Sequence, residues 1–485
     1  MTNSSQGKSK VVKNYIYNTL YQLLVILAPL ITTPYISRVL GAEGVGTYSY
    51  TRSIASYFIM VGTVGTTLYG QREIAYVQDK PEERTKVFWE ITIFRSVCVI
   101  VCSAIYYCIF ALHGQYAEIY QILMLEVVAT IFDISWFFIG LENFKTTVIR
   151  NIIVKLVGIV LTFVMVKEAN DVPLYTFCLT LPILIGNISL WFNLKKYLKR
   201  FDFSFFLSLK RHIKPILSLF FPQIATEVYL VLDKTMIGIL ANNTEVGYYT
   251  QAQQIIKVAL TIVTSLGAVM LPAMSAAFAR GEKKEIEHYI EGAFHFTFMI
   301  AAALAFGLCA ISDVFVPIFF GSGFDEVVPL MIVISPIVFI IGMSNVIGKQ
   351  YLLPTKQQTV YTLSVVGGAV ANFCLNMLFI PVLSAIGASI ATVAAELTVT
   401  GIQCWCVRKQ LQMLKFLKPL LKYIVLGIIM FAVVKGVGMI VPNNYIGLFV
   451  MICVGGIVYL LELLITKDSM LEQGKNLILN KVGKR

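Results

Sequence analysis

Runs of apolar residues, each roughly 20 residues long and separated by short polar segments, follow one another along almost the whole chain. A helix needs about 20 such residues to cross the hydrocarbon core of a bilayer. The runs are continuously apolar instead of alternating with polar residues, and this favours helices over strands. About fourteen runs qualify, and they cover residues 14–37, 45–69, 88–111, 118–141, 146–166, 173–194, 214–240, 245–272, 291–311, 326–348, 357–380, 385–407, 420–440 and 445–465. The pattern predicts an all-α polytopic membrane protein with fourteen transmembrane helices.

The composition agrees with this pattern. The chain has 485 residues, of which 57% are hydrophobic and only 14% are charged, and its mean hydropathy is +0.77. Soluble domains carry about 25% charged residues. The low charge therefore excludes a soluble cytosolic enzyme, and it also excludes a disordered chain or a small disulfide-stapled module.

The 39 Lys and Arg residues predict the orientation of the chain. If the amino terminus is cytoplasmic, the segments on that side hold 31 of them, whereas the opposite loops hold only Arg38 and Lys167. Cytoplasmic loops carry an excess of Lys and Arg, so this asymmetry predicts an even number of spans with both termini in the cytoplasm. Topology, and not nucleic-acid binding, then accounts for most of the net charge of +12.

A short internal repeat predicts two related halves. Residues 45–48 (Val-Gly-Thr-Tyr) open the second run and residues 246–249 (Val-Gly-Tyr-Tyr) open the eighth, an offset of 201 residues. Repeats of six spans have the same orientation and are related by an axis along the membrane normal, with a substrate site between them. We expect a six-helix lobe over 1–200, a second over 201–412, and two additional helices with a basic tail over 413–485.

Ionisable residues within the spans are the candidate functional groups, because each costs about 2.5–3.5 kcal/mol on insertion scales and needs a partner or a wet cavity. The basic candidates, in or at the mouth of the spans, are Arg38, Arg52, Arg95, Lys155, Lys234 and Lys257. The acidic candidates, which we assign to gating or ion pairing, are Glu126, Asp133, Glu227, Asp233 and Glu396.

Two interpretations of these charges stay open. In the first, acids and bases pair with one another and only orient the helices. In the second, the basic residues of both repeats line a cavity for an anionic ligand. The set as a whole favours the second interpretation, although any single residue fits the first equally well.

No pattern for catalysis or metal binding is present. The nine Cys residues lie in or at the edge of the spans without a CxxC pair, and the four His residues are scattered. There is no GxSxG, HExxH or P-loop motif, and no polar segment is long enough for an ATP-binding domain. We therefore predict neither an enzyme nor a protein with a metal or cofactor.

Several motifs resemble those of one family of membrane proteins. The segment 13–50, which contains PYISRVLGAEGVG at 34–46, is similar to the opening of the Wzx-type polysaccharide repeat-unit flippases of the multidrug/oligosaccharidyl-lipid/polysaccharide exporter superfamily. FDISWFFIGLE at 132–142 is equally specific, and weaker matches lie at 70–75, 232–238, 348–354 and 387–392. The resemblance covers roughly residues 13–410. One departure is Ala273, which stands where the family often has a basic residue, so a headgroup contact is not expected there.

The resemblance implies alternating access between two lobes. The cargo would be an undecaprenyl-pyrophosphate-linked oligosaccharide, moved from the inner to the outer leaflet of a bacterial cytoplasmic membrane for surface polysaccharide assembly. It also implies contact with membrane lipids, cooperation with a polysaccharide polymerase and glycosyltransferases, and a groove at the last two helices for the lipid tail, by analogy with lipid II flippases. An anion moves outward downhill by about 2.3 kcal/mol per charge per 100 mV, so the membrane potential suffices for direction.

Two other functions are compatible with a polytopic membrane protein. A cation-coupled multidrug exporter of the same superfamily needs acidic groups for organic cations, whereas these spans carry more bases. A membrane glycosyltransferase or polymerase needs catalytic acids and a sizeable loop, and the longest loops here are about 15–20 residues and basic. The glycosyltransferase is the weakest of the three.

Overall fold

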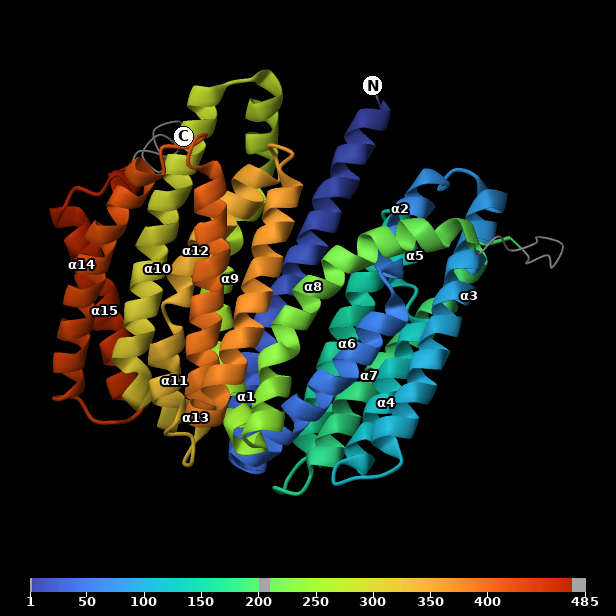
Figure 1. The fold of residues 1–485 in the computed structure, drawn as a ribbon, viewed down its shortest axis with the longest axis horizontal. Helices are drawn as coiled ribbons and strands as arrows, with labels where there is room; N and C mark the ends of the chain where they lie inside the picture. Colours follow the sequence, from blue (N-terminus) through green and yellow to red (C-terminus); the bar gives the residue numbers. More distant parts are fainter. Residues whose placement is uncertain (1, 200–209, 473–485) are drawn as a thin grey trace. The chain divides into compact units, whose positions relative to one another are not determined.

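The structure, a computed structural model, describes residues 2–199 and 210–472. Within these ranges the chain forms helices and no strands, and it divides into two compact units (Figure 1). The first unit comprises Met1–Gly238 with Asn242–Gly247, and the second comprises Ile239–Ala241 with Tyr248–Arg485.

The helices follow one another with short connections. The first unit holds α1 (Thr2–Thr63), α2 (Thr66–Tyr76), α3 (Pro81–Tyr106), the π-helix η1 (Tyr107–Ala111), α4 (Ala117–Phe132), α5 (Ser135–Gly140), α6 (Phe144–Met165), α7 (Val172–Trp191), the 3₁₀ turn η2 (Leu194–Lys196) and most of α8 (Lys210–Leu240). The second unit holds most of α9 (Asn243–Arg280), then α10 (Lys283–Phe320), α11 (Val327–Ile334), α12 (Ile337–Ser344), the π-helix η3 (Asn345–Leu352), α13 (Gln358–Val407), α14 (Met413–Gly438) and α15 (Tyr445–Ile465).

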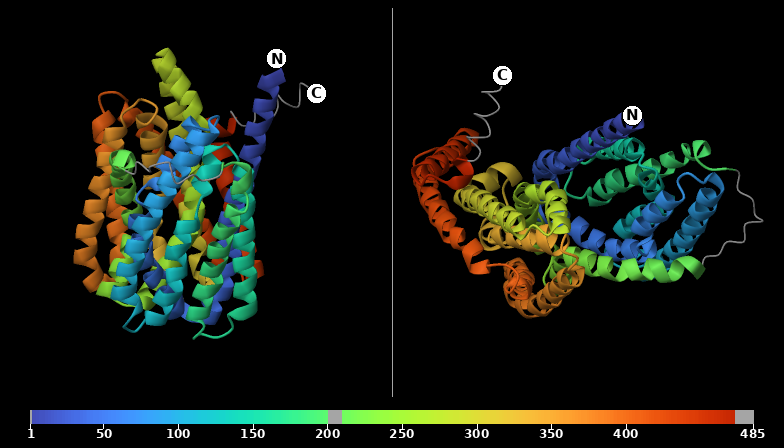
Figure 2. Two further views of the ribbon diagram at one scale, coloured as in Figure 1. Left: turned by 90° about the vertical axis from the view of Figure 1, so that its right-hand side faces the viewer. Right: turned by 90° about the horizontal axis from the view of Figure 1, so that it is seen from above.

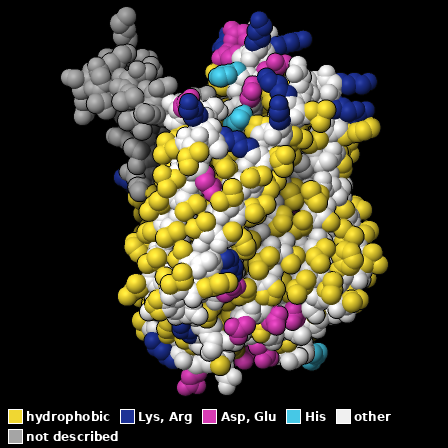
Figure 3. All heavy atoms as spheres, turned by 90° about the vertical axis from the view of Figure 1, so that its left-hand side faces the viewer, with side chains coloured by type: hydrophobic (Ala, Val, Ile, Leu, Met, Phe, Trp, Pro, Cys, Tyr) yellow, Lys and Arg dark blue, Asp and Glu magenta, His cyan; other side chains and the backbone are white. Residues whose placement is uncertain are grey.

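Eleven helical segments of the described ranges are long and apolar enough to cross a membrane. Two of these, Tyr21–Tyr76 with 56 residues and Gln358–Val407 with 50, are more than twice as long as one crossing requires. The chain is therefore a multi-pass membrane protein, as predicted, while the number of fourteen crossings stays a prediction. Figure 3 shows the accompanying surface: hydrophobic side chains cover the middle of the face, and charged side chains gather towards its two ends.

Both over-long segments contain a sharp break in the backbone. α1 breaks at Gly41, whose φ of 67° is in a region that residues with a side chain adopt rarely. α13 breaks at Ser384, with φ 50°. These breaks lie between the paired runs that the hydrophobic pattern separates at 37–45 and at 380–385, so α1 and α13 each consist of two consecutive helices.

An aromatic core holds the first unit together at one end of its helices. Phe88 of α3, Trp136 and Phe137 of α5 and Trp191 of α7 belong to one cluster, and the first three are fully buried. A Cβ at Gly70 of α2 would lie 2.4 Å from the Trp136 ring, so α2 and α5 pack as closely as glycine allows. The motifs at 70–75 and 132–142 thus contact each other directly.

The second unit has its own core around α10. Helix α10 packs against α14 and α15, which lie side by side at one edge of this unit (Figures 1 and 2). The chain beyond α15 folds back, because the Asp468 carboxylate accepts hydrogen bonds from Lys422 Nζ at 2.5 Å and from Tyr423 Oη at 2.9 Å. Asp468 therefore ties the segment after α15 to α14, and packing against α10 attaches both helices to the rest of the unit.

Candidate functional site

An ion pair between α1 and α4 contains the first of the predicted site residues. Arg52 Nη2 donates to Glu126 Oε1 at 2.7 Å and Nε donates to Oε2 at 3.2 Å, a two-pronged arrangement. The Arg52 side chain is 45% exposed, whereas that of Glu126 is 11% exposed. The carboxylate therefore holds the guanidinium from the protein side, and the other edge of the guanidinium stays accessible.

Arg52 has an aromatic and a cationic neighbour on adjacent helices. Tyr48, one turn earlier on α1, packs edge-on against Tyr175 of α7 with ring centroids 4.9 Å apart, and both phenols lie near the guanidinium. Lys155 of α6 is exposed, lies close enough to Arg52 for repulsion, and has no ion pair or hydrogen bond within the described residues. The Arg52–Glu126 pair is neutral, so Lys155 leaves this region with an excess positive charge.

A second charged cluster lies at the carboxy-terminal end of α4. Asp133 is 3.8 Å from Arg95 Nη2 of α3 and 3.6 Å from Arg150 Nη2 of α6. The Arg95 side chain is only 3% exposed, and its Nε and Nη1 have no hydrogen-bond partner among the described residues. Arg150 Nη1 also donates to Asn187 Oδ1 of α7 at 2.8 Å. Asp133 thereby joins the end of α4 to α3 and α6. The Arg95 side of this cluster is not accessible to solvent.

Four further candidates lie in the first unit. Arg38 is exposed and donates through Nη1 to the Pro34 carbonyl of its own helix at 3.1 Å. Asp233 of α8 is buried, and its neighbours Lys234 and Glu227 on α8 are partly buried. Thr235, which follows Lys234, hydrogen-bonds with Ser53 and Tyr57 of α1. Helix α8 is therefore attached to α1 along its charged segment.

The remaining two candidates lie in the second unit. Lys257 of α9 is exposed and Glu396 of α13 is partly buried. On the same two helices, Tyr249 and Thr392, each one or two turns before these residues, form a buried hydrogen bond of 3.0 Å. Of the predicted cations, the structure brings Arg52 and Lys155 together and joins Arg95 to Asp133.

The described residues contain no group of three or more His, Cys, Asp or Glu arranged to hold a metal ion.

Comparison with known proteins identifies the family. A family model described as "Polysaccharide biosynthesis protein" matches residues 11–278, more than half of the chain. The chain belongs to this family. A protein of Escherichia coli (strain K12) that is named as an O-antigen transporter is 25% identical over 408 residues, which cover 83% of this chain and 98% of that protein. The resemblance to the repeat-unit flippases is thereby confirmed.

Solved structures show that this chain shares its fold with known transporters. The lipid II flippase MurJ in its inward closed conformation matches with a TM-score of 0.72 at 16% identity, over 94% of this chain and 99% of that one. An inward-facing multidrug resistance transporter of the MATE family matches with a TM-score of 0.62 at 11% identity, over 80% of this chain and 99% of that one. At these identities the likeness concerns the fold alone.

Two charged residues that the sequence did not predict as site residues are buried in the structure. The charge distribution assigns Arg150 to the cytoplasmic end of a span. In the structure it lies in the second turn of α6, and its side chain is 14% exposed. Glu90 lies within the third apolar run and is fully buried. An acid between Val87, Phe88 and Ile91 is itself a signal, because an ionisable group in such a helix needs a partner.

The partner of Glu90 comes from the start of α8. His212 Nε2 lies 2.9 Å from Glu90 Oε2, and Arg211 forms an ion pair with the same carboxylate. On the other side of the imidazole, Tyr69 Oη of α2 lies 2.6 Å from Nδ1. These contacts connect α2, α3 and α8. His212 lies 143 residues from Tyr69 and 122 residues from Glu90 in sequence, which explains why a one-dimensional pattern does not reveal the cluster.

Proposed function

We propose that the chain is a flippase for undecaprenyl-pyrophosphate-linked oligosaccharides. It would move them from the inner to the outer leaflet of a bacterial cytoplasmic membrane for capsule-like or O-antigen-like polysaccharide, by alternating access between its two units. The family, the relative named as an O-antigen transporter and the fold of a lipid II flippase support this proposal.

The observation that carries the proposal is the way Arg52 is held. Glu126 occupies the Nε and Nη2 edge of the guanidinium, while Nη1 has no hydrogen-bond partner among the described residues. A guanidinium fixed on one edge and free on the other is suited to a phosphate oxygen, because planar N–H groups match phosphate geometry. The anchoring carboxylate lowers the entropy that Arg52 would lose on binding, so the free edge is preorganised.

The other cations extend the same role. We propose that Lys155, which adds an excess charge beside Arg52, and Arg38, Lys234 and Lys257 attract the pyrophosphate along its path, with Glu227, Asp233 and Glu396 as their counter-charges. Arg95 differs from them, because its side chain is 3% exposed and faces Asp133. We assign Arg95 and Asp133 to helix attachment, so that this pair orients the helices and does not contact the ligand.

A multidrug exporter has the same fold and is the alternative function. An organic cation requires an acid that is not already neutralised. In the first unit, Glu126 is held by Arg52, and Asp133 lies between Arg95 and Arg150. The charges around Arg52 and around Asp133 therefore favour an anionic ligand. A glycosyltransferase is disfavoured further, since the relative named above is a transporter.

The proposal is tested by lipid analysis of a strain that lacks the gene and is complemented with variants. We expect the deletion strain to lose surface polysaccharide and to accumulate the lipid-linked oligosaccharide inside. The Arg52→Ala variant should correct neither defect. Arg280→Ala is the matched control, because Arg280 is 50% exposed and also pairs with carboxylates, those of Glu282 and Glu285. Full restoration by a stably inserted Arg52→Ala protein would overturn the role of Arg52, and unchanged glycan lipids in the deletion would overturn the function.

Assembly partners follow from the proposed function. A translocated repeat unit is a substrate for a polymerase on the outer side, and glycosyltransferases must build it on the inner side. Contact of this chain with either enzyme stays a prediction, and membrane lipids are its immediate surroundings.

A further inference from the structure

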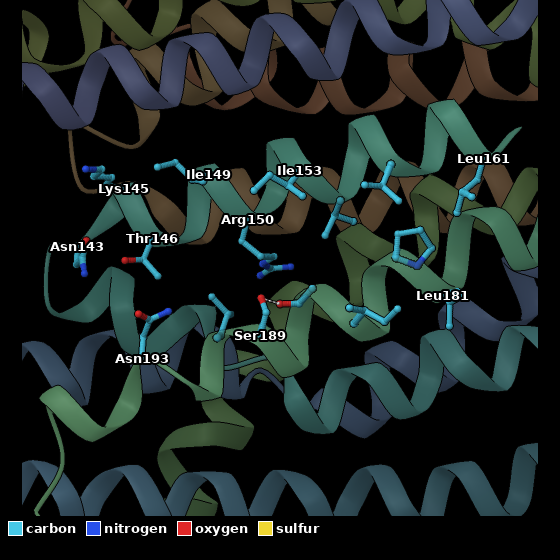
Figure 4. Close-up of a pocket in the computed structure, with 16 residues that line it drawn as sticks. Asn143, Lys145, Thr146, Ile149, Arg150, Ile153, Leu161, Leu181, Ser189 and Asn193 are labelled. Atoms are coloured by element: carbon cyan, nitrogen blue, oxygen red, sulfur yellow. Dashed lines mark hydrogen bonds between the residues drawn. The ribbon is translucent and has the colours of Figure 1, made fainter. Parts of the chain in front are cut away.

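A groove of about 720 Å³ lies between α6 and α7 in the first unit (Figure 4). Its long wall is apolar: Ile149, Ile153 and Leu161 of α6 face Leu181 and Ile185 of α7. Several of these side chains are open to the surroundings, with Ile153 55% and Ile185 58% exposed. In a helix that crosses a membrane, an open apolar groove of this kind contacts hydrocarbon chains.

The groove is long enough to hold one chain of a lipid. From Lys145 to Leu161 the α6 backbone rises by about 24 Å, at 1.5 Å per residue. One leaflet contributes half of a hydrocarbon core about 30 Å thick. The groove therefore extends over the full depth of a leaflet.

Only one end of the groove is polar, and that end is basic. It is formed by Asn143, Lys145 and Thr146 at the start of α6 and by Asn193 just after α7. None of the lining residues is acidic. Figure 4 shows Lys145, Asn143, Thr146 and Asn193 together at this end and Arg150 further along. The distribution of Lys and Arg along the chain places this end on the cytoplasmic side.

Two features at this end, and a third further along the groove, attract an anion. Lys145 is exposed and has no ion pair or hydrogen bond within the described residues. The first turn of α6 begins after Asn143, whose side chain makes no cap hydrogen bond, so the helix amino terminus keeps free N–H groups and its positive dipole end. Deeper in the groove, the Nε of Arg150 is buried without a hydrogen-bond partner in the described part of the chain.

We propose that this groove binds an anionic glycerophospholipid of the cytoplasmic leaflet, with the phosphate at Lys145 and the start of α6 and one acyl chain along α6 and α7. The basic end accounts for the charge of the headgroup and the apolar wall accounts for the chain. The site does not rest on the proposed transport function, because a bilayer phospholipid surrounds any membrane protein.

The test is native mass spectrometry of the full-length protein in detergent, with phosphatidylglycerol and phosphatidylcholine of the same acyl chains added. We expect the protein to retain one phosphatidylglycerol in preference to phosphatidylcholine. Lys145→Ala weakens phosphatidylglycerol retention about five-fold, since one basic residue near a headgroup contributes that much, and it leaves phosphatidylcholine unchanged. Lys145→Arg keeps the preference. Ile185→Trp, which fills the groove, weakens both lipids.

Two matched variants control for general effects. Ile100→Trp changes an equally exposed isoleucine, 57% against 58%, on α3. Lys418→Ala removes an exposed lysine near the start of α14 that likewise has no ion pair among the described residues. We expect neither variant to alter the preferred retention. Equal retention of the two lipids by the unaltered protein, equal losses in the control variants, or displacement of phosphatidylglycerol by equimolar undecaprenyl phosphate would overturn the proposal.

Discussion

Asp133→Asn tests whether the buried charges of the first unit act as one cluster. The substitution removes the negative charge that lies 3.8 Å from Arg95 and 3.6 Å from Arg150, and it keeps the size of the side chain. At an effective dielectric constant of about 20, each of these attractions amounts to about 4 kcal/mol before the cost of desolvation. Removing one partner of a buried pair costs about 3–5 kcal/mol in the free energy of unfolding, because an unpaired charge is left behind. We expect Asp133→Asn to reach the lower end of that range, since Arg150 keeps its hydrogen bond to Asn187.

The assay is denaturant unfolding of the purified protein in micelles, followed for the single and double variants. Arg95→Leu alone should cost less than Asp133→Asn, because Asp133 still faces Arg150. The double variant Arg95→Leu/Asp133→Asn should be more stable than Asp133→Asn alone, because the unpaired cation that was 3% exposed is gone. Asp325→Asn, at an exposed acid, is the control and should be neutral. Wild-type stability of Asp133→Asn, or further loss on adding Arg95→Leu, would refute the reasoning.

Two further perturbations test the packing and the carboxy-terminal attachment. Burial alone would raise the pKa of Asp468, but the hydrogen-bonded Lys422 ammonium and Tyr423 hydroxyl lower it below its ordinary value. Its contribution is therefore present above the unfolded pKa and lost as the pH falls through the folded one, so the stability deficit of Asp468→Asn should shrink on acidification; a deficit independent of pH between 7 and about 3 contradicts this. Gly70→Ala places a Cβ 2.4 Å from Trp136 and should cost about 1–3 kcal/mol, whereas Gly401→Ala, where a Cβ meets nothing within 4 Å, should stabilise the helix by up to about 1 kcal/mol. Equal melting temperatures of these two glycine variants would show that α2 and α5 are not closely packed.

The helical class was predictable because each span is encoded locally. A run of about 20 apolar residues has one stable form in a bilayer, so the amino-acid sequence suffices. The two breaks coincide with gaps between the apolar runs. Gly41 lies in the gap 38–44, which holds Arg38 and Glu43, and Ser384 ends the short gap 381–384, which begins with Pro381. Two of the family motifs also meet in space, because Gly70 of α2 lies directly against the Trp136 ring of α5.

The pairing of charges was not predictable from the same patterns. Arg52 lies 74 residues from Glu126, and Glu90 lies 122 residues from His212, so no periodicity along the chain relates them. The sequence indicates that ionisable groups in spans need partners, but partner choice depends on how neighbouring helices are rotated about their axes. Arg150 shows the same limit, because a shift of one turn at a helix end changes a loop residue into a buried one.

The most direct test of the proposed function is movement of a labelled polyprenyl-pyrophosphate-linked oligosaccharide across liposomes that contain the purified protein. A charged hydrogen bond to phosphate contributes about 1.5–3 kcal/mol, so we expect Arg52→Ala to slow this movement about ten-fold or more, while Arg280→Ala moves the lipid like the unaltered protein. Equal rates for Arg52→Ala and the unaltered protein, or transport of an organic cation with no movement of the glycan lipid, would contradict the account.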